Sequence, residues 1–404
     1  MSGSVGLGVA VLSAGIWVYL VFFRGAFWRL SDFDDDRRAI SAEQKFPRVC
    51  AIVPARNEAA TIAATVTSLM QQDYPGEFSV AVVDDHSNDG TSQIARETSA
   101  RATSTDGDVN ARGDGNRFAI YFAAALQTGW TGKLWALNEG VRHVWAEAEQ
   151  RGGAVEFFWF TDADIQHAPD TLRRLVARAE SDRLDMASLM VLLRARTPPE
   201  KLLIPAFVYF FLQLYPPRWI ADPKTRTAGA AGGCLLIRDS ALRRIGGLTA
   251  VRGELIDDCM LARAVKRAGG RLWMGVTRSS ASLRDYTGFA EIRDMIARTA
   301  FTQLRYSAPL LFLTIVALFL TYLAPVALLF TGANVPRTLS IIACVLMAAS
   351  FLPTIRYYCL SPAWALLLPA VAAFYAYATL LSAVRFWLGR GGQWKGRAQA
   401  PPCA

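Results

Sequence analysis

Four long stretches without a charged residue constrain this chain most strongly. They contain no Asp, Glu, Lys or Arg and cover residues 1–23, 306–336, 338–355 and 357–384. A helix of about 20 apolar residues crosses the ~30 Å hydrocarbon core of a bilayer. We therefore predict four membrane helices, at about 3–23, 309–331, 338–355 and 362–384. The segment 338–355 is short enough to be a re-entrant or interfacial helix instead.

The first apolar stretch is either an uncleaved anchor or a signal peptide. No basic residue precedes it, and Arg24-Gly25-Ala26 is only a weak cleavage site, so an anchor is favoured. The predicted organisation follows the chain in order: an anchor at 1–23, a connector at 24–46, a large domain outside the membrane at 47–305, a membrane region of two to three helices at 306–384 and a basic tail at 385–404.

Charge is divided unevenly between these segments. All 34 acidic residues and 37 of the 43 basic ones lie between residues 24 and 305, which leaves that part at only +3. The formal charge of +9 comes mostly from a basic C-terminal fringe, which suits anionic lipid headgroups and does not indicate nucleic acid. The six cysteines form no CxxC pair, so neither a zinc site nor a disulfide framework is predicted.

Basic residues also predict the orientation. Several follow the first helix and none precedes it, which places 24–305 on the cytoplasmic side of an inner (cytoplasmic) membrane. Three full spans afterwards would put the basic tail on the opposite side, against the same rule. The number of C-terminal spans is therefore left open at two or three.

Apolar strands and amphipathic helices alternate through the middle segment. Strands are predicted at 48–58, 78–91, 117–124, 154–165 and 184–194, and 99–117 reads as a surface loop. This alternation predicts an α/β fold with a doubly wound, mostly parallel, Rossmann-like sheet. The apolar segment 201–220 contains three prolines and fits either an interfacial helix on the membrane or a buried domain helix.

Three of the predicted strands end in polar or acidic clusters. These are Pro54-Ala55-Arg56-Asn57-Glu58, Asp84-Asp85-His86-Ser87 and Thr161-Asp162-Ala163-Asp164. Ligands of open parallel sheets bind at the carboxyl ends of the strands, so three such clusters predict one site. Taken alone, the residues from Asp84 to Asp89 would more often form a turn stabilised by their own side chains than a binding site.

Asp162-Ala163-Asp164 is the sharpest of these clusters. In extended backbone, residues two apart point the same way, so both carboxylates would face one cation. Mg²⁺ or Mn²⁺ would then be shared with diphosphate oxygens and would neutralise a leaving diphosphate. The alternative is a pair of aspartates that cap the next helix.

Lys133 and the pair Asp257-Asp258 complete the candidates. Lys133 precedes a predicted helix and would reach phosphate as a point charge, or it is a solvated surface lysine. Asp257 and Asp258 either cap a helix or supply a general base for an acceptor hydroxyl. The residues alone support both alternatives equally.

Together these motifs resemble the large inverting glycosyltransferase family 2, of GT-A type, which includes cellulose, ceramide-glucose and dolichol-phosphate-mannose synthases. The matching motifs occur in the family's order across about 47–305: "AIVPARNE", "VVDDHSNDGT", "GKLWALN", "TDAD", "AGGCLLIR" and "IDDCML". The segments "ARTAFTQLRYS" and "RFWLGRGGQWKGR" are most similar to bacterial hopene-associated glycosyltransferases.

The resemblance implies a role for each matching residue. Asp258 is implied as the catalytic base with Asp257 beside it, and Gly232 and Gly233 as part of the acceptor pocket. Asp162 and Asp164 are implied to hold Mn²⁺ or Mg²⁺ and the donor phosphates. The implied nucleotide-sugar contacts are Pro54, Arg56, Glu58, Asp84, Asp85, Lys133, Asp162, Arg298 and Arg305.

The expected function is therefore a membrane-bound inverting transfer from a UDP-sugar to a lipid. The acceptor is left open between a hopanoid, a polyprenyl phosphate and a glycerolipid. Relatives that make polysaccharide carry Gln-x-x-Arg-Trp, whereas here Gln303-Leu304-Arg305 is followed by Tyr306, which argues against a growing polysaccharide. A nucleotidyltransferase would need a Gly-rich loop that "PARNEAATI" lacks, and an inactive membrane scaffold would be expected to have lost the acids.

Overall fold

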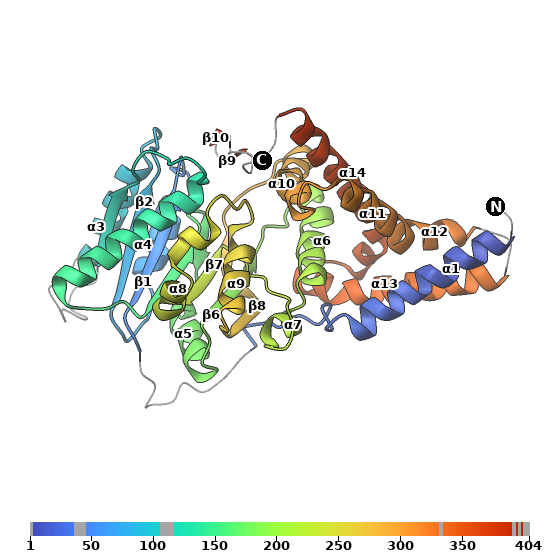
Figure 1. The fold of residues 1–404 in the computed structure, drawn as a ribbon, viewed down its shortest axis with the longest axis horizontal. Helices are drawn as coiled ribbons and strands as arrows, with labels where there is room; N and C mark the ends of the chain where they lie inside the picture. Colours follow the sequence, from blue (N-terminus) through green and yellow to red (C-terminus); the bar gives the residue numbers. More distant parts are fainter. Residues whose placement is uncertain are drawn as a thin grey trace. The chain divides into compact units, whose positions relative to one another are not determined.

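The computed structural model describes residues 3–35, 46–105, 117–330, 334–389, 393–394 and 397–398. The chain divides into two compact units (Figure 1). The helical unit comprises Met1–Leu30, Arg194–Trp219 and Asp285–Gly392. The sheet unit comprises Ser31–Leu193, Ile220–Arg284 and Gln393–Ala404. Part of the predicted connector and part of the predicted basic tail lie outside the described residues.

The sheet unit is built on an eight-stranded sheet in the order β3-β2-β1-β4-β7-β6-β8-β5. Its strands are β1 (Val49–Ala55), β2 (Phe78–Asp84), β3 (Phe118–Phe122), β4 (Phe157–Thr161), β5 (Ile165–His167), β6 (Met186–Leu192), β7 (Cys234–Arg238) and β8 (Leu272–Ser282). β3, β2, β1 and β4 run parallel, whereas β7 is antiparallel to both of its neighbours and β5 is antiparallel to β8. The α/β fold class is confirmed, on a sheet that is more mixed than predicted.

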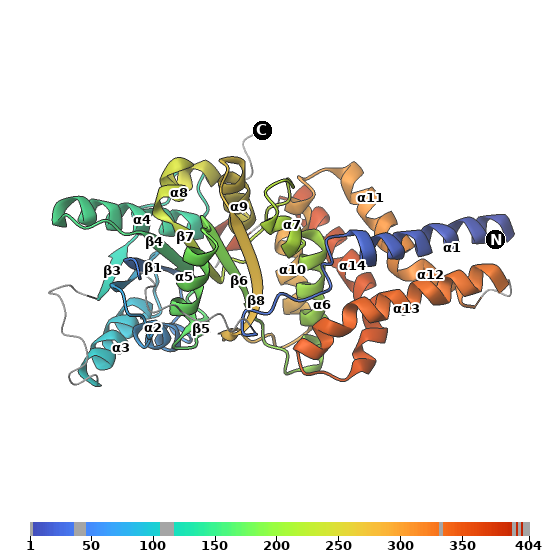
Figure 2. The ribbon, with the colours of Figure 1, turned by 90° about the horizontal axis from the view of Figure 1, so that it is seen from below.

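Helices cover both faces of this sheet, which is why its central strands are apolar throughout. The helices are α2 (Ile62–Met70), α3 (Thr91–Thr105), α4 (Gly132–Arg151), α5 (Thr171–Ser181), α8 (Asp239–Arg244) and α9 (Asp257–Arg267), with a 3₁₀ turn at Gly247–Val251. Figure 2 shows α2, α3 and α5 on one face and α4, α8 and α9 on the other. Every residue of β1 and β4 is buried as a result.

The strand register brings the predicted polar clusters to one edge. Ala55 of β1 pairs with Asp84 of β2, and Ile52 of β1 pairs with Phe160 of β4. The segments that follow these three strands therefore begin at nearly the same level of the sheet.

Two local predictions are wrong. The strand predicted at 154–165 ends at Thr161, and Ile165–His167 forms the separate strand β5, which pairs with β8. The surface loop predicted at 99–117 is helical as far as Thr105, because α3 continues, and residues 106–116 lie outside the description.

Three residues of the predicted connector, Asp32, Phe33 and Asp34, join the sheet unit. Asp32 bridges Val276 of β8, and Phe33 is buried in the core beside Trp273, with ring centroids 6.1 Å apart. The carboxylate of Asp34 accepts hydrogen bonds from Thr277 Oγ1 and from the backbone N–H of Arg278. The chain is thus fixed to β8 directly after the helical unit's first segment.

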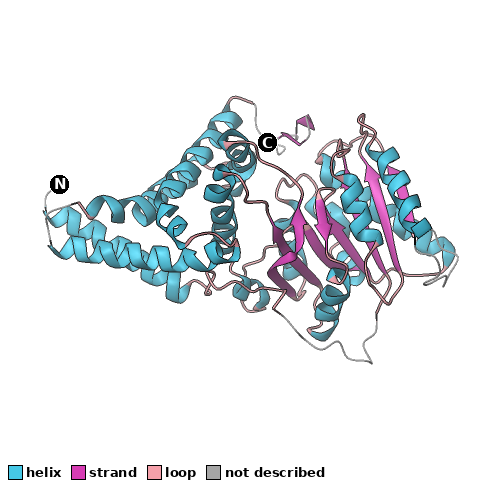
Figure 3. Cartoon of the chain, turned by 180° about the vertical axis from the view of Figure 1, so that it is seen from behind, coloured by secondary structure: helices cyan, strands magenta, loops and turns pink. Residues whose placement is uncertain are grey.

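Within its described residues, the helical unit contains no strand (Figure 3). Its elements are α1 (Gly3–Val18), a π-helical turn (Tyr19–Phe23), α6 (Pro198–Leu214), α10 (Phe289–Gln303), α11 (Ala308–Leu318), a second π-helical turn (Phe319–Leu323), α12 (Ala324–Leu328), α13 (Asn334–Tyr357), a 3₁₀ turn (Pro362–Leu367) and α14 (Leu368–Trp387). The short α7 (Pro217–Ala221) lies at the boundary of the units, and β9 (Gln393–Trp394) pairs with β10 (Arg397–Ala398).

Among the residues that the structure describes, four helices are long and apolar enough to cross a membrane. They are Ser4–Phe23, Ala308–Leu328, Asn334–Tyr357 and Pro362–Trp387, of 20, 21, 24 and 26 residues. The third extends beyond the predicted 338–355, so its length is sufficient for a full span.

The apolar segment predicted at 201–220 forms α6 and the start of α7. Pro205 lies inside α6 without ending it, and the helix stops before Pro216. Packing against α10, α13 and α14 buries α6, and Tyr209 Oη lies 2.7 Å from Ser350 Oγ of α13. The helix therefore packs within the helical unit and is not a core helix of the sheet unit.

Candidate active site

A small pocket lies at the edge of the sheet where β1 and β4 end. It is lined by six of the predicted site residues: Pro54, Lys133, Asp162, Gly232, Asp257 and Asp258. These residues come from five separate segments of the sheet unit. The structure therefore brings together residues that are more than 200 positions apart in the sequence.

Lys133 and Asp162 form the polar centre of this pocket. Lys133 lies at the first turn of α4, and its Nζ is 2.6 Å from Asp162 Oδ1. Burial opposes the charge of Lys133, but the carboxylates of Asp162, Asp257 and Asp258 outweigh burial and raise its pKa above the ordinary value. Lys133 is therefore a permanent cation in an acidic pocket, and not a solvated surface lysine.

Asp162-Ala163-Asp164 forms a turn, so the prediction that its backbone is extended is wrong. The N–H of Ile165 donates to Asp162 O at 3.3 Å, which closes the turn between β4 and β5. Thr65 Oγ1 donates to Ala163 O at 2.9 Å, and Leu283 N donates to Asp164 O at 2.8 Å. The turn is thus fixed by α2 and by the end of β8.

The side chain of Asp164 lies among like charges. Burial, and then the carboxylates of Asp162 and Glu58, raise the pKa of Asp164 to about 6, while Arg284 and Lys133 act in the opposite direction. Asp162 and Asp164 therefore concentrate negative charge beside the pocket.

Asp258 lies in the first turn of α9 and is fixed through both carboxylate oxygens. Oδ2 accepts from Gly232 N at 2.9 Å, and Oδ1 accepts from Cys259 N at 2.7 Å. Burial and the neighbouring Asp257 raise the pKa of Asp258 to about 6, against the effect of Lys133 and the two N–H donors. A carboxylate with this pKa is suited to general base chemistry near neutral pH.

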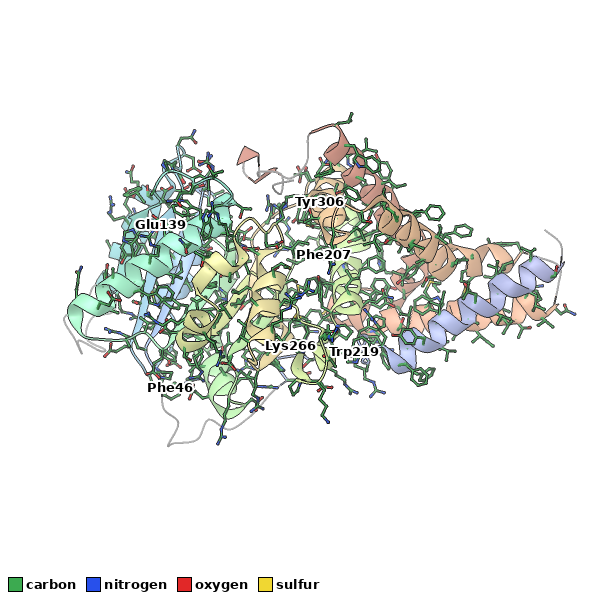
Figure 4. The ribbon with its side chains drawn as sticks, viewed as in Figure 1. Phe46, Glu139, Phe207, Trp219, Lys266 and Tyr306 are labelled. Carbon is green, nitrogen blue, oxygen red and sulfur yellow. The ribbon has the colours of Figure 1, made fainter. Side chains whose placement is uncertain are left out.

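The other end of α9 is fastened by Lys266, which Figure 4 labels. Lys266 Nζ donates to Ile220 O at 2.8 Å and to Thr227 O at 2.7 Å. The helix that carries Asp258 is therefore tied to the segment that leads into the Gly-rich loop.

Gly232 stands where a side chain would disturb the pocket. A Cβ at this position would lie 3.3 Å from Asp258 Oδ2 and 3.4 Å from Lys133 Nζ. At Gly233 a Cβ would meet Val191 Cγ2 at 3.3 Å, away from these charged groups. Of the two predicted acceptor glycines, only Gly232 lines the pocket.

The loops after β1 and β2 are interlocked beside the pocket. Arg56 Nη1 donates to Asp85 O and lies 3.6 Å from Asp85 Oδ2, and Asp85 is fully buried. Asp84 Oδ1 accepts from Ser87 N at 2.8 Å, and Glu58 N donates to Thr91 Oγ1 at 2.8 Å. The turn chemistry foreseen for Asp84 is therefore present.

Two predicted nucleotide contacts belong to the helical unit and not to the unit that carries the pocket. Arg298 lies on α10, and Arg305 follows it with a positive φ of 52°. The ring of Tyr306, at the position of the absent tryptophan, stacks on Phe386 at 4.3 Å.

Sequence reasoning gave no role to the apolar part of the pocket or to Arg284. The apolar lining residues are Leu134, Leu137, Phe160, Leu235, Leu248 and Leu261. Each lies in a helix, strand or turn whose pattern only predicts burial. Thr161 also lines the pocket and belongs to a predicted cluster, whereas Arg284, which acts on Asp164, carried no motif of its own.

The donor set fits a divalent cation that takes part of its ligands from a substrate. Among the described residues, no group of three or more His, Cys, Asp or Glu side chains could hold a metal ion. Asp162 and Asp164 supply two carboxylates, and burial and neighbouring carboxylates raise the pKa of Asp164 despite the positive charges of Arg284 and Lys133. Mg²⁺ and Mn²⁺ accept such sites, because they commonly bind one or two carboxylates together with substrate phosphates.

Comparison with known proteins agrees with this geometry. Residues 50–246 match the family model described as Glycosyl transferase family 2. This part of the chain is thus similar to glycosyltransferase family 2, and the predicted enzyme class, a glycosyltransferase, is confirmed. Comparison with curated proteins finds no match.

Two solved glycosyltransferases are among the structures to which this chain is similar. The mannosyltransferase PcManGT from Pyrobaculum calidifontis, in complex with GDP-Man and Mn²⁺, aligns with 94% of this chain and 99% of its own, at 19% identity and a TM-score of 0.51. S. aureus TarS 1-349 in complex with UDP-GlcNAc aligns with 87% of this chain and 95% of its own, at 16% identity and a TM-score of 0.37. The similarity to PcManGT confirms a GT-A-type fold.

Proposed function

We propose that this protein transfers a sugar from a nucleoside-diphosphate sugar to a hydroxyl group of a membrane lipid, with inversion at the anomeric carbon. One observation carries the proposal: a fixed carboxylate, Asp258, shares a pocket with the Lys133–Asp162 ion pair. A base and a diphosphate-binding cation are the two groups that a single displacement requires.

Asp258 is the proposed general base. Its two oxygens each accept one backbone hydrogen bond, which leaves lone pairs on both for the proton of an acceptor hydroxyl. As that proton moves to Asp258, the acceptor oxygen bonds to the anomeric carbon and the bond to the diphosphate oxygen breaks. The nucleoside diphosphate leaves with the electron pair. Lys133 then balances the charge on the leaving group.

The ends of β1 and β2 are the proposed binding surface for the nucleoside. Pro54 lines the pocket, and Arg56, Glu58, Asp84 and Asp85 continue from it. Hydrogen bonds from Asn57 N to Ser87 Oγ and from Glu58 N to Thr91 Oγ1 join the two loops and fix this surface. UDP is the expected nucleotide. PcManGT, which shares the fold, was solved with GDP-Man, so guanosine donors belong in the assay.

Asp162 and Asp164 are the proposed ligands of Mn²⁺ or Mg²⁺. When bound, the cation would neutralise charge on the donor diphosphate. PcManGT was solved with Mn²⁺. In this chain the two residues lie in a turn that α2 and β8 fix, so their positions do not depend on the donor.

A lipid acceptor is proposed because the same chain has four helices of membrane-spanning length. We propose an inner-membrane location with the sheet unit on the cytoplasmic side, on the basis of the basic residues that follow the first span. Hopanoids, polyprenyl phosphates and glycerolipids are the acceptor classes to compare.

The test uses the full chain purified in detergent with a total lipid extract. Radiolabelled UDP-sugars and GDP-mannose are supplied separately with Mn²⁺, and label is followed into the lipid phase. We expect label in lipid, an inverted anomeric configuration in the product and loss of transfer in Asp258→Asn and Asp164→Ala.

Asp170→Asn is the matched control for Asp258→Asn. Asp170 also stands at the start of a helix of the sheet unit, α5, but does not line the pocket. It should retain transfer. Near-normal turnover in Asp258→Asn would refute the base assignment. The absence of any heat of binding for UDP with Mn²⁺ in the wild type would favour an inactive scaffold.

A further inference from the structure

A buried histidine lies behind the pocket and takes no part in the proposed chemistry. His167, at the end of β5, is 3% exposed, and its ring lies 4.5 Å from the ring of Trp159. Its Nε2 lies 2.8 Å from Thr161 Oγ1, and its Nδ1 lies 2.8 Å from Ser280 Oγ. Both ring nitrogens therefore have a buried hydroxyl partner.

The directions of these hydrogen bonds follow from which atoms carry a proton and which can only accept one. Thr161 Oγ1 also lies 2.9 Å from Gly233 O, and a carbonyl can only accept, so the single hydroxyl proton of Thr161 points to Gly233. His167 Nε2 must then donate to Thr161 Oγ1. If the imidazole is neutral, its Nδ1 is unprotonated and accepts from Ser280 Oγ–H.

A neutral imidazole agrees with the surroundings. Burial lowers the pKa of His167 to about 3, and both ring nitrogens have a neutral hydroxyl as their hydrogen-bond partner. The result is a chain of hydrogen bonds in one direction, from Ser280 through His167 and Thr161 to the carbonyl of Gly233.

This chain ends between the two charged parts of the pocket. Thr161 directly precedes Asp162, which pairs with Lys133. Gly233 directly follows Gly232, whose N–H holds Asp258 Oδ2 at 2.9 Å. The hydroxyl of Thr161 thus adds a side-chain hydrogen bond between the strand that leads to Asp162 and the loop that positions Asp258, at the point where the pairing of Thr161 with Cys234 ends the β4–β7 ladder.

We propose that Thr161 and His167 are positioning residues that set the separation between the donor-binding Asp162 and the base Asp258. His167 leaves the proton of Thr161 only one acceptor, the Gly233 carbonyl, and so fixes the Gly-rich loop. The inference rests on the proposed function for its catalytic consequence, but its structural part concerns only the loop.

The alternative is a histidine that merely satisfies its own hydrogen bonds in the core. Loss of its bonds would then lower stability without a particular effect on turnover. A positioning role predicts a different pattern: turnover falls much more than donor affinity, because misplacement of a catalytic group by about 1 Å costs up to ~100-fold in rate.

Thr161→Val is the decisive variant, since it removes the hydroxyl and keeps the shape. Thr277→Val is its matched control: Thr277 is equally buried on β8 of the same sheet, and its hydroxyl donates to Asp34 Oδ1 at 3.0 Å, away from the Gly-rich loop. Thr161→Ser restores the hydroxyl. Each protein is assayed for kcat, donor KM and thermal midpoint as the full chain in detergent.

We expect Thr161→Val to lose about 10- to 100-fold in kcat with a change of less than about 3-fold in donor KM. Thr161→Ser should recover most of the turnover. Thr277→Val should lower the thermal midpoint to a similar degree and keep kcat. Equal kcat in Thr161→Val and Thr277→Val would overturn the positioning role.

Hydrogen exchange of the segment 228–236 gives a readout that does not depend on transfer. The amide of Gly232 should exchange faster in Thr161→Val than in the wild type. Its exchange rate in Thr277→Val should equal that of the wild type. Unchanged exchange in Thr161→Val would overturn the proposal even if transfer is observed. A wild-type protein without transfer, but with this exchange pattern, would refute only the proposed function.

Discussion

The pKa of Asp258 leads to a quantitative prediction for the pH dependence of transfer. A carboxylate acts as a base only when it is deprotonated, and the pKa of Asp258 is raised from 3.8 to about 6 by burial and by Asp257. At about 1.4 kcal/mol for each pH unit, the raised pKa corresponds to roughly 3 kcal/mol in favour of the protonated form.

Transfer should therefore slow as the pH falls. Below about pH 6 the fraction of deprotonated Asp258 falls tenfold per pH unit, and kcat/KM falls with it. The ratio of kcat/KM at pH 5 to that at pH 7 should be about 0.1. An aspartate with an ordinary pKa would give a ratio of about 0.9.

The assay is transfer of label to lipid at limiting donor, from pH 4.5 to 8. Asp257→Asn removes the like charge, so the acidic limb should move to lower pH. Thermal unfolding over the same pH range shows whether the fold persists. A wild-type kcat/KM that is flat down to pH 5, with the fold intact, would refute the argument.

Three further predictions concern binding and stability. Lys133→Met removes the cation that faces Asp162, so the Kd for UDP with Mn²⁺ should rise by roughly 10- to 100-fold in calorimetry, and an unchanged Kd would exclude a diphosphate contact. Because the folded pKa of His167, about 3, lies below its unfolded value of 6.5, this residue's contribution to stability is complete above pH 6.5 and is lost as pH falls. The wild type should therefore lose roughly 2 kcal/mol between pH 6.5 and 5 relative to His167→Gln, and equal pH dependence of the two thermal midpoints would contradict this. Phe33→Ala empties a fully enclosed ring site and should lower the stability of the sheet unit by about 3–5 kcal/mol, whereas a wild-type melting curve by circular dichroism would mean that the connector is not part of the core.

Much of the sheet could be predicted because its signal is local. β1, β2 and β4 are apolar runs that each end in a polar cluster, and Asp84 and Asp162 could be recognised from these strand ends. Lys133 could be recognised from its place at the start of a predicted helix. Helices on both faces explain the apolar runs, and parallel pairing explains why their ends meet.

The parts that were missed depend on contacts between distant segments. The turn at Asp162-Ala163-Asp164 is held by Thr65 and Leu283, which are 98 or more positions away in the sequence, so the tripeptide itself does not reveal it. β5 has only three residues and is specified by its partner β8. Leu134 and Leu137 line the pocket, but their spacing predicts only that one face of α4 is buried.

The burial of α6 has a consequence for biosynthesis. Its neighbours α10, α13 and α14 all come later in the chain, as do β7 and β8, which complete the sheet unit. A ribosome therefore releases Leu203, Ile204 and Tyr209 well before any of the helices that bury them has been made. Until the last span is inserted, this apolar helix must be shielded by lipid or by a chaperone, and ribosomal stalling between residues 220 and 308 should leave it open to cross-linking.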